Sequence, residues 1–200
     1  MDFLQLVSEA RTCRRFVQDA RISQDVLNWL MEGARCTPCG RNAQVLRYIL
    51  VSSPEKCAAL FVHMRWAGAL KDWDGPVEGE RPTAYIAVLS PKESAAIVQM
   101  DVGIVAQTIQ LAAHTKGIGC CMHASFDRPS CMELLRVPED MQIALILALG
   151  MAKEERRLAL MPASGEFAYW RDAQGVHHVP KRAVSELAVI KPAEKKKVKK

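Results

Sequence analysis

The chain has 200 residues, of which 50% are apolar and 24% are charged, so it can bury a globular core. It has no apolar run near the roughly 18 residues of a membrane-spanning helix, and its first residues lack the basic start and apolar block of a signal peptide. The formal net charge of +5 comes from the five lysines among residues 195–200, which leaves the remainder neutral. We therefore expect one domain over residues 1–190, a disordered Lys-rich tail over 191–200, and neither a specific nucleic-acid partner nor a membrane.

The number of cysteines indicates whether the protein resides in a reducing or an oxidising compartment. The chain contains seven cysteines, an odd number. In a chain without a secretion signal, this count favours reduced thiols over a disulfide framework. We therefore expect a cytoplasmic protein.

Apolar residues at helical spacing predict an amphipathic helix at residues 3–7 and a second helix that Ser23 caps. Pro38 and Gly40 end this second helix, and an apolar strand is expected at 46–51. After this strand we expect a helix from Pro54 to Met64, a loop at 66–82, a strand at 83–89 and a helix at 95–115. Two further strands are expected at 118–122 and 143–149, with a helical turn at 129–135 between them. A hairpin or extended arm is expected at 169–179.

The helix at 95–115 is apolar nearly all round. This pattern is typical of a helix buried in the centre of a domain or in a subunit interface. Helices and strands are mixed without a regular βαβ rhythm, so the sequence predicts an α+β fold.

Two basic segments are suited to binding an anion. Residues 11–16, Arg-Thr-Cys-Arg-Arg-Phe, place guanidinium groups beside a hydroxyl, and a guanidinium offers paired, charge-assisted donors to a phosphate or carboxylate. Lys181 and Arg182 are a second candidate for such a contact, far along the chain. A solvated basic turn and a basic surface pair are the plain alternatives.

Two further segments are suited to a planar ligand. Residues 36–44, Cys-Thr-Pro-Cys-Gly-Arg-Asn-Ala-Gln, place the amides of Asn42 and Gln44 beside exposed backbone N–H groups, which suits the edge of a heterocycle. A polar connecting loop is the alternative. Gly117 and Gly119 would let the backbone approach a ligand closely, or would simply separate a helix from a strand.

In this order and spacing, the four segments resemble the FMN-dependent nitroreductase family. Residues 11–16 are similar to its phosphate-binding signature, Arg-Ser-x-Arg-x-Phe, and residues 38–44 to its Pro-Ser-x-x-Asn-x-Gln loop. The similarity extends over about residues 8–188 and includes the arm at 169–186. The chain departs from the family at Cys39, where Ser is frequent, and at Val45-Leu46, where Pro-Trp is common.

The resemblance implies a nitroreductase-like α+β fold, with a central, mostly antiparallel sheet flanked by helices, in an intertwined homodimer that holds FMN at its interface. It implies that the cofactor phosphate is contacted by Arg11, Thr12, Arg14 and Arg182, with Lys181 assisting. It also implies that the flavin ring is met by Pro38, Cys39, Gly40 and Asn42 of a second copy, with Gln44 nearby, and passed by Gly119 and Cys120. Trp66 and Trp73 would cover the flavin or pack beneath their own loop.

The implied activity is that of an NAD(P)H-dependent FMN oxidoreductase. Electrons would pass from NADH or NADPH to a small oxidant, such as a nitroaromatic, a quinone or an enone, by a ping-pong mechanism. We expect no catalytic side chain, because the flavin carries the chemistry. The alternatives are an FMN-binding protein of the same fold with another or weak activity (dehalogenation, flavin breakdown, ring oxidation), and a structural or interaction protein without flavin.

Cys36 and Cys39 form a Cys-x-x-Cys motif, which leaves a dithiol redox or metal-binding interpretation open. The motif follows a helix instead of preceding one, and Pro38 lies within its turn. No second motif of this kind completes a zinc site, and the adjacent His177 and His178 would point to opposite faces of a strand. We therefore expect no metal.

Overall fold

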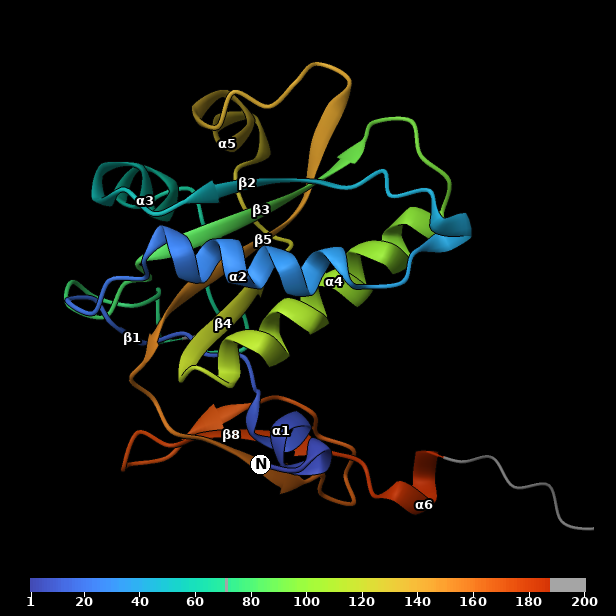
Figure 1. Ribbon diagram of the computed structural model, residues 1–200. Coiled ribbons are helices and arrows are strands. Elements are labelled where there is room, and N and C mark those ends of the chain that lie inside the picture. The colour runs from blue at the N-terminus through green and yellow to red at the C-terminus, as the bar shows by residue number, and fades with distance from the viewer. Residues whose placement is uncertain (71, 188–200) are drawn as a thin grey trace, which may run out of the picture.

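The computed structural model of the chain describes residues 1–70 and 72–187 (Figure 1). The Lys-rich tail expected over 191–200 lies outside the described residues.

A five-stranded sheet forms the centre of the structure (Figure 1). Its longest strand, β5, pairs antiparallel with β1, β3 and β4, and β2 pairs antiparallel with β3. The predicted antiparallel central sheet flanked by helices is therefore confirmed. The strands are β1 (Phe16–Val17), β2 (Arg47–Val51), β3 (Ala84–Pro91), β4 (Ile118–His123) and β5 (Met141–Ala152).

Helices cover both faces of this sheet, because its central strands are apolar on both sides. Along β3, Ile86 and Val88 face one core, shared with α2 (Gln24–Arg35) and α4 (Ile97–His114). Tyr85 and Ala87 face the other core, shared with α3 (Pro54–Phe61) and α5 (Arg128–Leu134). The result is a three-layer arrangement in which α2 and α4 lie together on one side (Figure 1).

Polar side chains cap the N-terminal ends of α2 and of the first helix. Ser23 accepts the N–H of Val26 at 3.3 Å, as its position before α2 predicts. The helix expected near residues 3–7 is α1 (Phe3–Glu9), with Asp2 as its N-cap. The buried helix expected at 95–115 is α4, which has an exposed face as well as a buried one.

A second, three-stranded sheet lies at the end of the molecule beside α1 (Figure 1). The predicted hairpin is confirmed: β7 (Trp170–Arg171) pairs antiparallel with β8 (His177–Lys181), and the Asp172 side chain accepts backbone N–H groups in the turn. β6 (Arg156–Leu160) runs parallel to β8 and was not expected from the sequence. The short helices η1 (Gly40–Asn42) and α6 (Val184–Leu187) complete the described structure.

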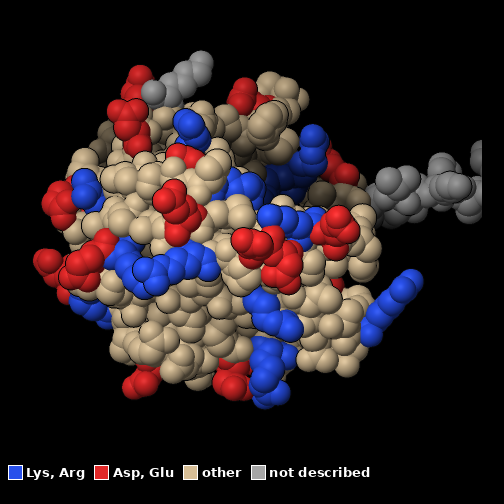
Figure 2. Space-filling model, turned by 90° about the horizontal axis from the view of Figure 1, so that it is seen from above, with Lys and Arg blue, Asp and Glu red and all other residues tan. Residues whose placement is uncertain are grey.

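Surface charge is mixed on the face seen from above. Figure 2 shows basic and acidic side chains interspersed there, with uncharged surface between them. This distribution agrees with a body that is close to neutral once the terminal lysines are set aside.

Candidate functional site

A pocket of about 210 Å³ brings the two ends of the chain together. We call it the basic pocket. Among the described residues that line it, none is acidic and three are cationic. Its lining comprises Ala10, Arg11, Thr12, Arg14, Gln107, Gln110, Tyr169, His177, Val179 and Lys181.

Three neighbouring side chains fix the geometry of this pocket. Nη1 of Arg14 lies 3.2 Å from Nε2 of His177, 163 residues further along the chain, and the Arg14 guanidinium stacks 4.4 Å above the Tyr169 ring. A guanidinium can only donate, so Nε2 of His177 accepts and Nδ1 carries the ring proton. Burial lowers the pKa of His177 to about 4, so the ring is neutral at pH 7.

Glu154 anchors the C-terminal arm to the basic segment. Its fully buried carboxylate accepts the backbone N–H of Arg14 through one oxygen and pairs with Arg171 through the other, at 2.9 Å. The carboxylate is thereby committed to these two donors. Arg14 and β8 are held on either side of the pocket as a result.

The basic pocket contains buried donors without partners. Nε of Arg11 and Nδ1 of His177 are buried and make no hydrogen bond among the described residues. Nη2 of Arg11 donates to Val7 O at 2.6 Å, and burial lowers the pKa of this guanidinium. Such groups are costly unless an acceptor satisfies them, so the pocket fits a small anionic group such as the phosphate of FMN.

The predicted basic residues do not all reach this pocket. The structure brings Arg11, Thr12, Arg14 and Lys181 together there, while Arg182 is exposed and lies just beyond β8. A contact between Arg182 and phosphate stays a prediction.

The loop at 38–44 lies at the opposite end of α4 and is tied to it. Oδ1 of the buried Asp101 accepts the N–H of Gly40 at 2.8 Å. A Cβ at Gly40 would come within 2.6 Å of Ile97, so the close approach requires glycine. Asn42 and Gln44 are exposed and have positive φ angles of 54° and 49°. A strained, exposed loop of this kind is typical of ligand-binding segments.

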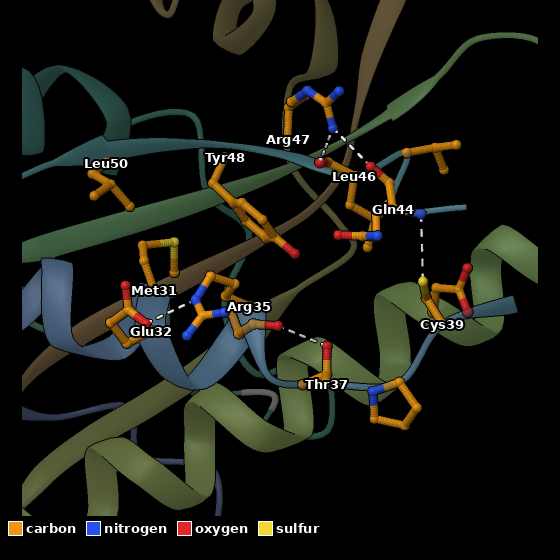
Figure 3. Close-up of a pocket in the computed structure, with 14 residues that line it drawn as sticks. Met31, Glu32, Arg35, Thr37, Cys39, Gln44, Leu46, Arg47, Tyr48 and Leu50 are labelled. Carbon is orange, nitrogen blue, oxygen red and sulfur yellow. Dashed lines mark hydrogen bonds and ion pairs between the residues drawn. The ribbon is translucent and has the colours of Figure 1, made fainter. Parts of the chain in front are cut away.

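A second pocket, of about 480 Å³, opens beside this loop (Figure 3). Pro38, Cys39 and Gln44 line it together with side chains of α2 and β2, among them Met31 and Tyr48. Of the flavin-ring residues expected in this loop, these three are grouped here, Gly40 lines an adjoining pocket and Asn42 lines neither, and the loop lies apart from the basic pocket within one chain.

The two cysteines of the Cys-x-x-Cys motif form no disulfide in the described structure. Cys36 is exposed, Cys39 is half-buried, and both are free. Sγ of Cys39 accepts the N–H of Gln44 at 3.4 Å, so it supports the loop (Figure 3). Within residues 1–70 and 72–187, no three His, Cys, Asp or Glu side chains lie close enough to hold a metal ion.

Gly119 and Cys120 have packing roles in the structure. A Cβ at Gly119 would lie 2.5 Å from Sγ of the buried Cys13. The Cys120 side chain belongs to the core beneath α2 and α4, and its carbonyl accepts the N–H of Cys13 at 2.9 Å. A direct flavin contact by either residue stays a prediction.

Trp66 and Trp73 link the 66–82 loop to the rest of the structure. Trp66 packs edge-on against His123, with ring centroids 4.4 Å apart, and lies 6.5 Å from Trp73. The Arg171 guanidinium covers Trp73 at 4.3 Å, so the loop meets the C-terminal arm. Burial lowers the pKa of His123 to about 4.

Sequence reasoning missed Asp101, Glu154, Tyr169 and His177. Asp101 could have been noticed, because it is a carboxylate within an otherwise apolar helical pattern. The other three gain their roles only from contacts between distant segments.

Comparison with models of protein families identifies the family of this chain. The model of the nitroreductase family matches residues 7–151. The chain belongs to the nitroreductase family. Comparison with curated protein sequences gave no match.

Solved structures share the nitroreductase fold with this chain. An FMN-dependent nitroreductase from Clostridium difficile R20291 is 21% identical, with a TM-score of 0.63 over 78% of this chain and 90% of that one. A nitroreductase with bound FMN from Desulfitobacterium hafniense DCB-2 is 22% identical, with a TM-score of 0.62 over 84% and 97%. A protein from Desulfovibrio desulfuricans in complex with FMN is 19% identical, with a TM-score of 0.64 over 94% and 96%. At these identities the likeness establishes the fold.

None of the helices in the described part of the chain combines the length and apolarity that a bilayer span needs.

Proposed function

We propose that the protein is an FMN-dependent oxidoreductase that passes electrons from NADH or NADPH to a small oxidant, with FMN held at the interface of a homodimer. Family membership supports an oxidoreductase, and FMN is bound in the related structures from Desulfovibrio and Desulfitobacterium. The basic pocket is the single observation that carries the proposal.

This pocket has the properties that a cofactor phosphate needs. Arg11, Arg14 and Lys181 converge on it from both ends of the chain, without an acidic residue among the described lining. Thr12 adds a hydroxyl beside them. In the proposed complex, Nε of Arg11, which has no partner among the described residues, faces an anion that offsets its burial.

A second copy of the chain is proposed because the flavin-ring loop and the basic pocket lie at different ends of α4. Met100 is 63% exposed and Ile104 is 39% exposed on the outer face of this helix. Large apolar side chains on one helix face are typical of an interface. The exposed Asn42 and Gln44 would then present their amides to the cofactor of the other copy.

Bound FMN would supply the redox chemistry, taking a hydride from the nicotinamide and passing electrons to a nitroaromatic, quinone or enone in a ping-pong cycle. The chain itself would grip the phosphate through Arg11 and Arg14, and orient the ring through the 38–44 loop. The seven free cysteines support a reducing, cytoplasmic compartment.

Cofactor binding is tested by the visible spectrum of the purified protein and by titration of flavin-free protein with FMN and riboflavin. Replacing Arg14 with Gln is expected to weaken FMN binding by about tenfold or more, with little change for riboflavin, which lacks the phosphate. Arg157 is the matched control, because it is 63% exposed and pairs with Glu155 at the surface. Wild-type protein that folds and binds no FMN contradicts the proposal.

Turnover is tested separately by anaerobic stopped-flow mixing of the FMN-loaded protein with NADH and with NADPH. Loss of the oxidised flavin absorbance with at least one of them is the expected result. If FMN stays oxidised with both, the reductase assignment is wrong although FMN binding stands.

A further inference from the structure

The Arg14 guanidinium has an uncharged side chain as its partner, just as the Arg11 guanidinium in the same pocket has an uncharged backbone carbonyl. Nη1 of Arg14 donates to His177 Nε2 at 3.2 Å, and the Arg14 guanidinium stacks on Tyr169. In the part of the chain that the structure describes, no carboxylate bonds to this guanidinium. The positive charge of Arg14 is therefore left unpaired.

The neighbouring cations show the contrast. Arg15, next in sequence, forms a two-point contact with Glu80, and Lys153 joins the same carboxylate at 3.1 Å. Arg171, on the arm, pairs with Glu154 at 2.9 Å. Each of these three cations has a carboxylate within contact distance, and none of the three lines the basic pocket.

Glu154 lies beside the backbone of Arg14 but forms no ion pair with its side chain among the described residues. It accepts the Arg14 backbone N–H and gives its other oxygen to Arg171. The side chain of Arg14 bonds to a neutral imidazole instead.

We propose that His177 is a positioning residue for the anion-binding pocket, holding the Arg14 guanidinium with an uncharged acceptor so that Arg14 is aligned yet keeps its full charge for the ligand. A carboxylate in the same place would orient Arg14 equally well, but it would neutralise that charge and repel an incoming phosphate. The neutral imidazole orients Arg14 without neutralising its charge. This inference rests on the proposed function, because it takes the ligand to be a phosphate-bearing flavin.

The surroundings of His177 keep the ring neutral. Burial is the main cause of its lowered pKa, and the cationic Arg14, Arg171 and Arg156 act in the same direction, whereas Glu154 opposes them. The Tyr169 ring lies 5.1 Å from the imidazole and completes its enclosure. A neutral acceptor is therefore maintained at physiological pH.

Three substitutions of His177 test the inference, with FMN and riboflavin as the two probes. His177→Gln keeps an uncharged acceptor, and FMN affinity is expected to stay within about threefold of wild type. His177→Glu adds a carboxylate, and FMN affinity is expected to fall by about tenfold or more while riboflavin affinity is unchanged. His177→Leu removes the acceptor without adding charge, and it is expected to weaken FMN alone by a smaller factor.

His178→Gln is the matched control. His178 is adjacent in sequence, but its ring bonds to Asp172 at 2.7 Å and stacks on Trp170, away from Arg14. Its replacement is expected to leave the ratio of the two flavin affinities unchanged. Thermal melting of each flavin-free variant shows which of them fold. If the Glu variant does not fold, the Leu variant tests the inference.

The outcomes separate this inference from the function on which it rests. If wild type binds FMN more tightly than riboflavin and the Glu and Leu variants retain that preference, the role of His177 is wrong and the proposed function stands. If the variants lose both flavins equally, His177 is merely structural and the inference is overturned. If wild-type protein binds neither flavin, the proposed function fails and the inference fails with it.

Discussion

Asp101, in the middle of the first half of α4, accepts the backbone N–H of Gly40 at 2.8 Å and so ties the 38–44 loop to the longest helix of the protein. Asp101 is 5% exposed, and the loop beyond Gly40 contains three non-glycine residues with positive φ. A loop in so unfavourable a conformation needs an anchor, and this carboxylate provides one.

Replacing Asp101 with Ala is expected to leave the Gly40 N–H without its acceptor and to lower the free energy of unfolding by about 1–2 kcal/mol. FMN should also dissociate faster, because the loop is no longer held. Asp101→Asn keeps the acceptor oxygen and is expected to behave much like wild type. Urea unfolding and FMN release measure the two effects, and Gln99→Ala, at an exposed position of the same helix, is the control. Equal behaviour of the Ala and Asn variants would contradict an anchoring role.

The sequence predicted most helices and strands because their apolar periodicity is strong. The strands β2 to β5, α2, α4 and the hairpin at β7 and β8 follow from that pattern and from the turn at Asp172, whereas the antiparallel pairing in the central sheet was implied by the family resemblance. β6 escaped prediction because its residues, Arg-Arg-Leu-Ala-Leu, are mostly exposed and it pairs only with β8, far along the chain.

The candidate site was predictable in part. Arg11 and Arg14 were predicted because their guanidinium groups lie beside a hydroxyl in a segment that resembles the phosphate-binding signature of the family. His177 was not found, because its role depends on Arg14, 163 residues away, which only the folded arm brings to it. Position 119 needs a glycine for a steric reason, because Cys13 packs against it from a different segment. The sequence alone could not reveal this contact.

Gly119→Ala tests whether this glycine serves packing or flavin approach. The new Cβ would lie 2.5 Å from Cys13 Sγ, and Cys13 is fully buried, so the free energy of unfolding is expected to fall by about 1–3 kcal/mol. FMN affinity of the folded variant is expected to stay within about threefold of wild type. Gly68→Ala is the control, because a Cβ there meets nothing within 4 Å. A large loss of FMN affinity with little loss of stability would instead favour direct approach of the flavin to Gly119.

Glu80 is expected to make stability depend on pH in the acid range. Its carboxylate is bound by Arg15 and by Lys153, and the Arg15 contact is the main reason that its pKa is lowered to about 2 from 4.5. The stabilisation is present above the unfolded value of 4.5 and is lost as the pH falls toward 2. Glu80→Gln should therefore cost on the order of 2 kcal/mol at pH 7, and the difference from wild type should shrink below pH 4.5.

Urea unfolding of both proteins at several pH values between 7 and 3 measures this dependence. Glu78→Gln is the matched control, because Glu78 is 70% exposed and its pairing with Arg81 lies at the surface. Such a pair contributes at most about 1 kcal/mol. A Glu80 variant whose deficit is the same at every pH would show that charge is not the cause.

The outer face of α4 is expected to join two copies of the chain. Met100 and Ile104 lie one helical turn apart on this face, at 63% and 39% exposure. Changing both to Glu would place unpaired carboxylates in an apolar contact, so a wild-type dimer is expected to become a monomer in light-scattering measurements at micromolar concentration. The variant should also lose FMN, because the 38–44 loop of the second copy would no longer reach the cofactor. Val62→Glu, at an exposed apolar position beyond α3, should leave both properties intact. A wild-type chain that is monomeric and still binds FMN tightly would show that one copy suffices, and the loop would then need another role.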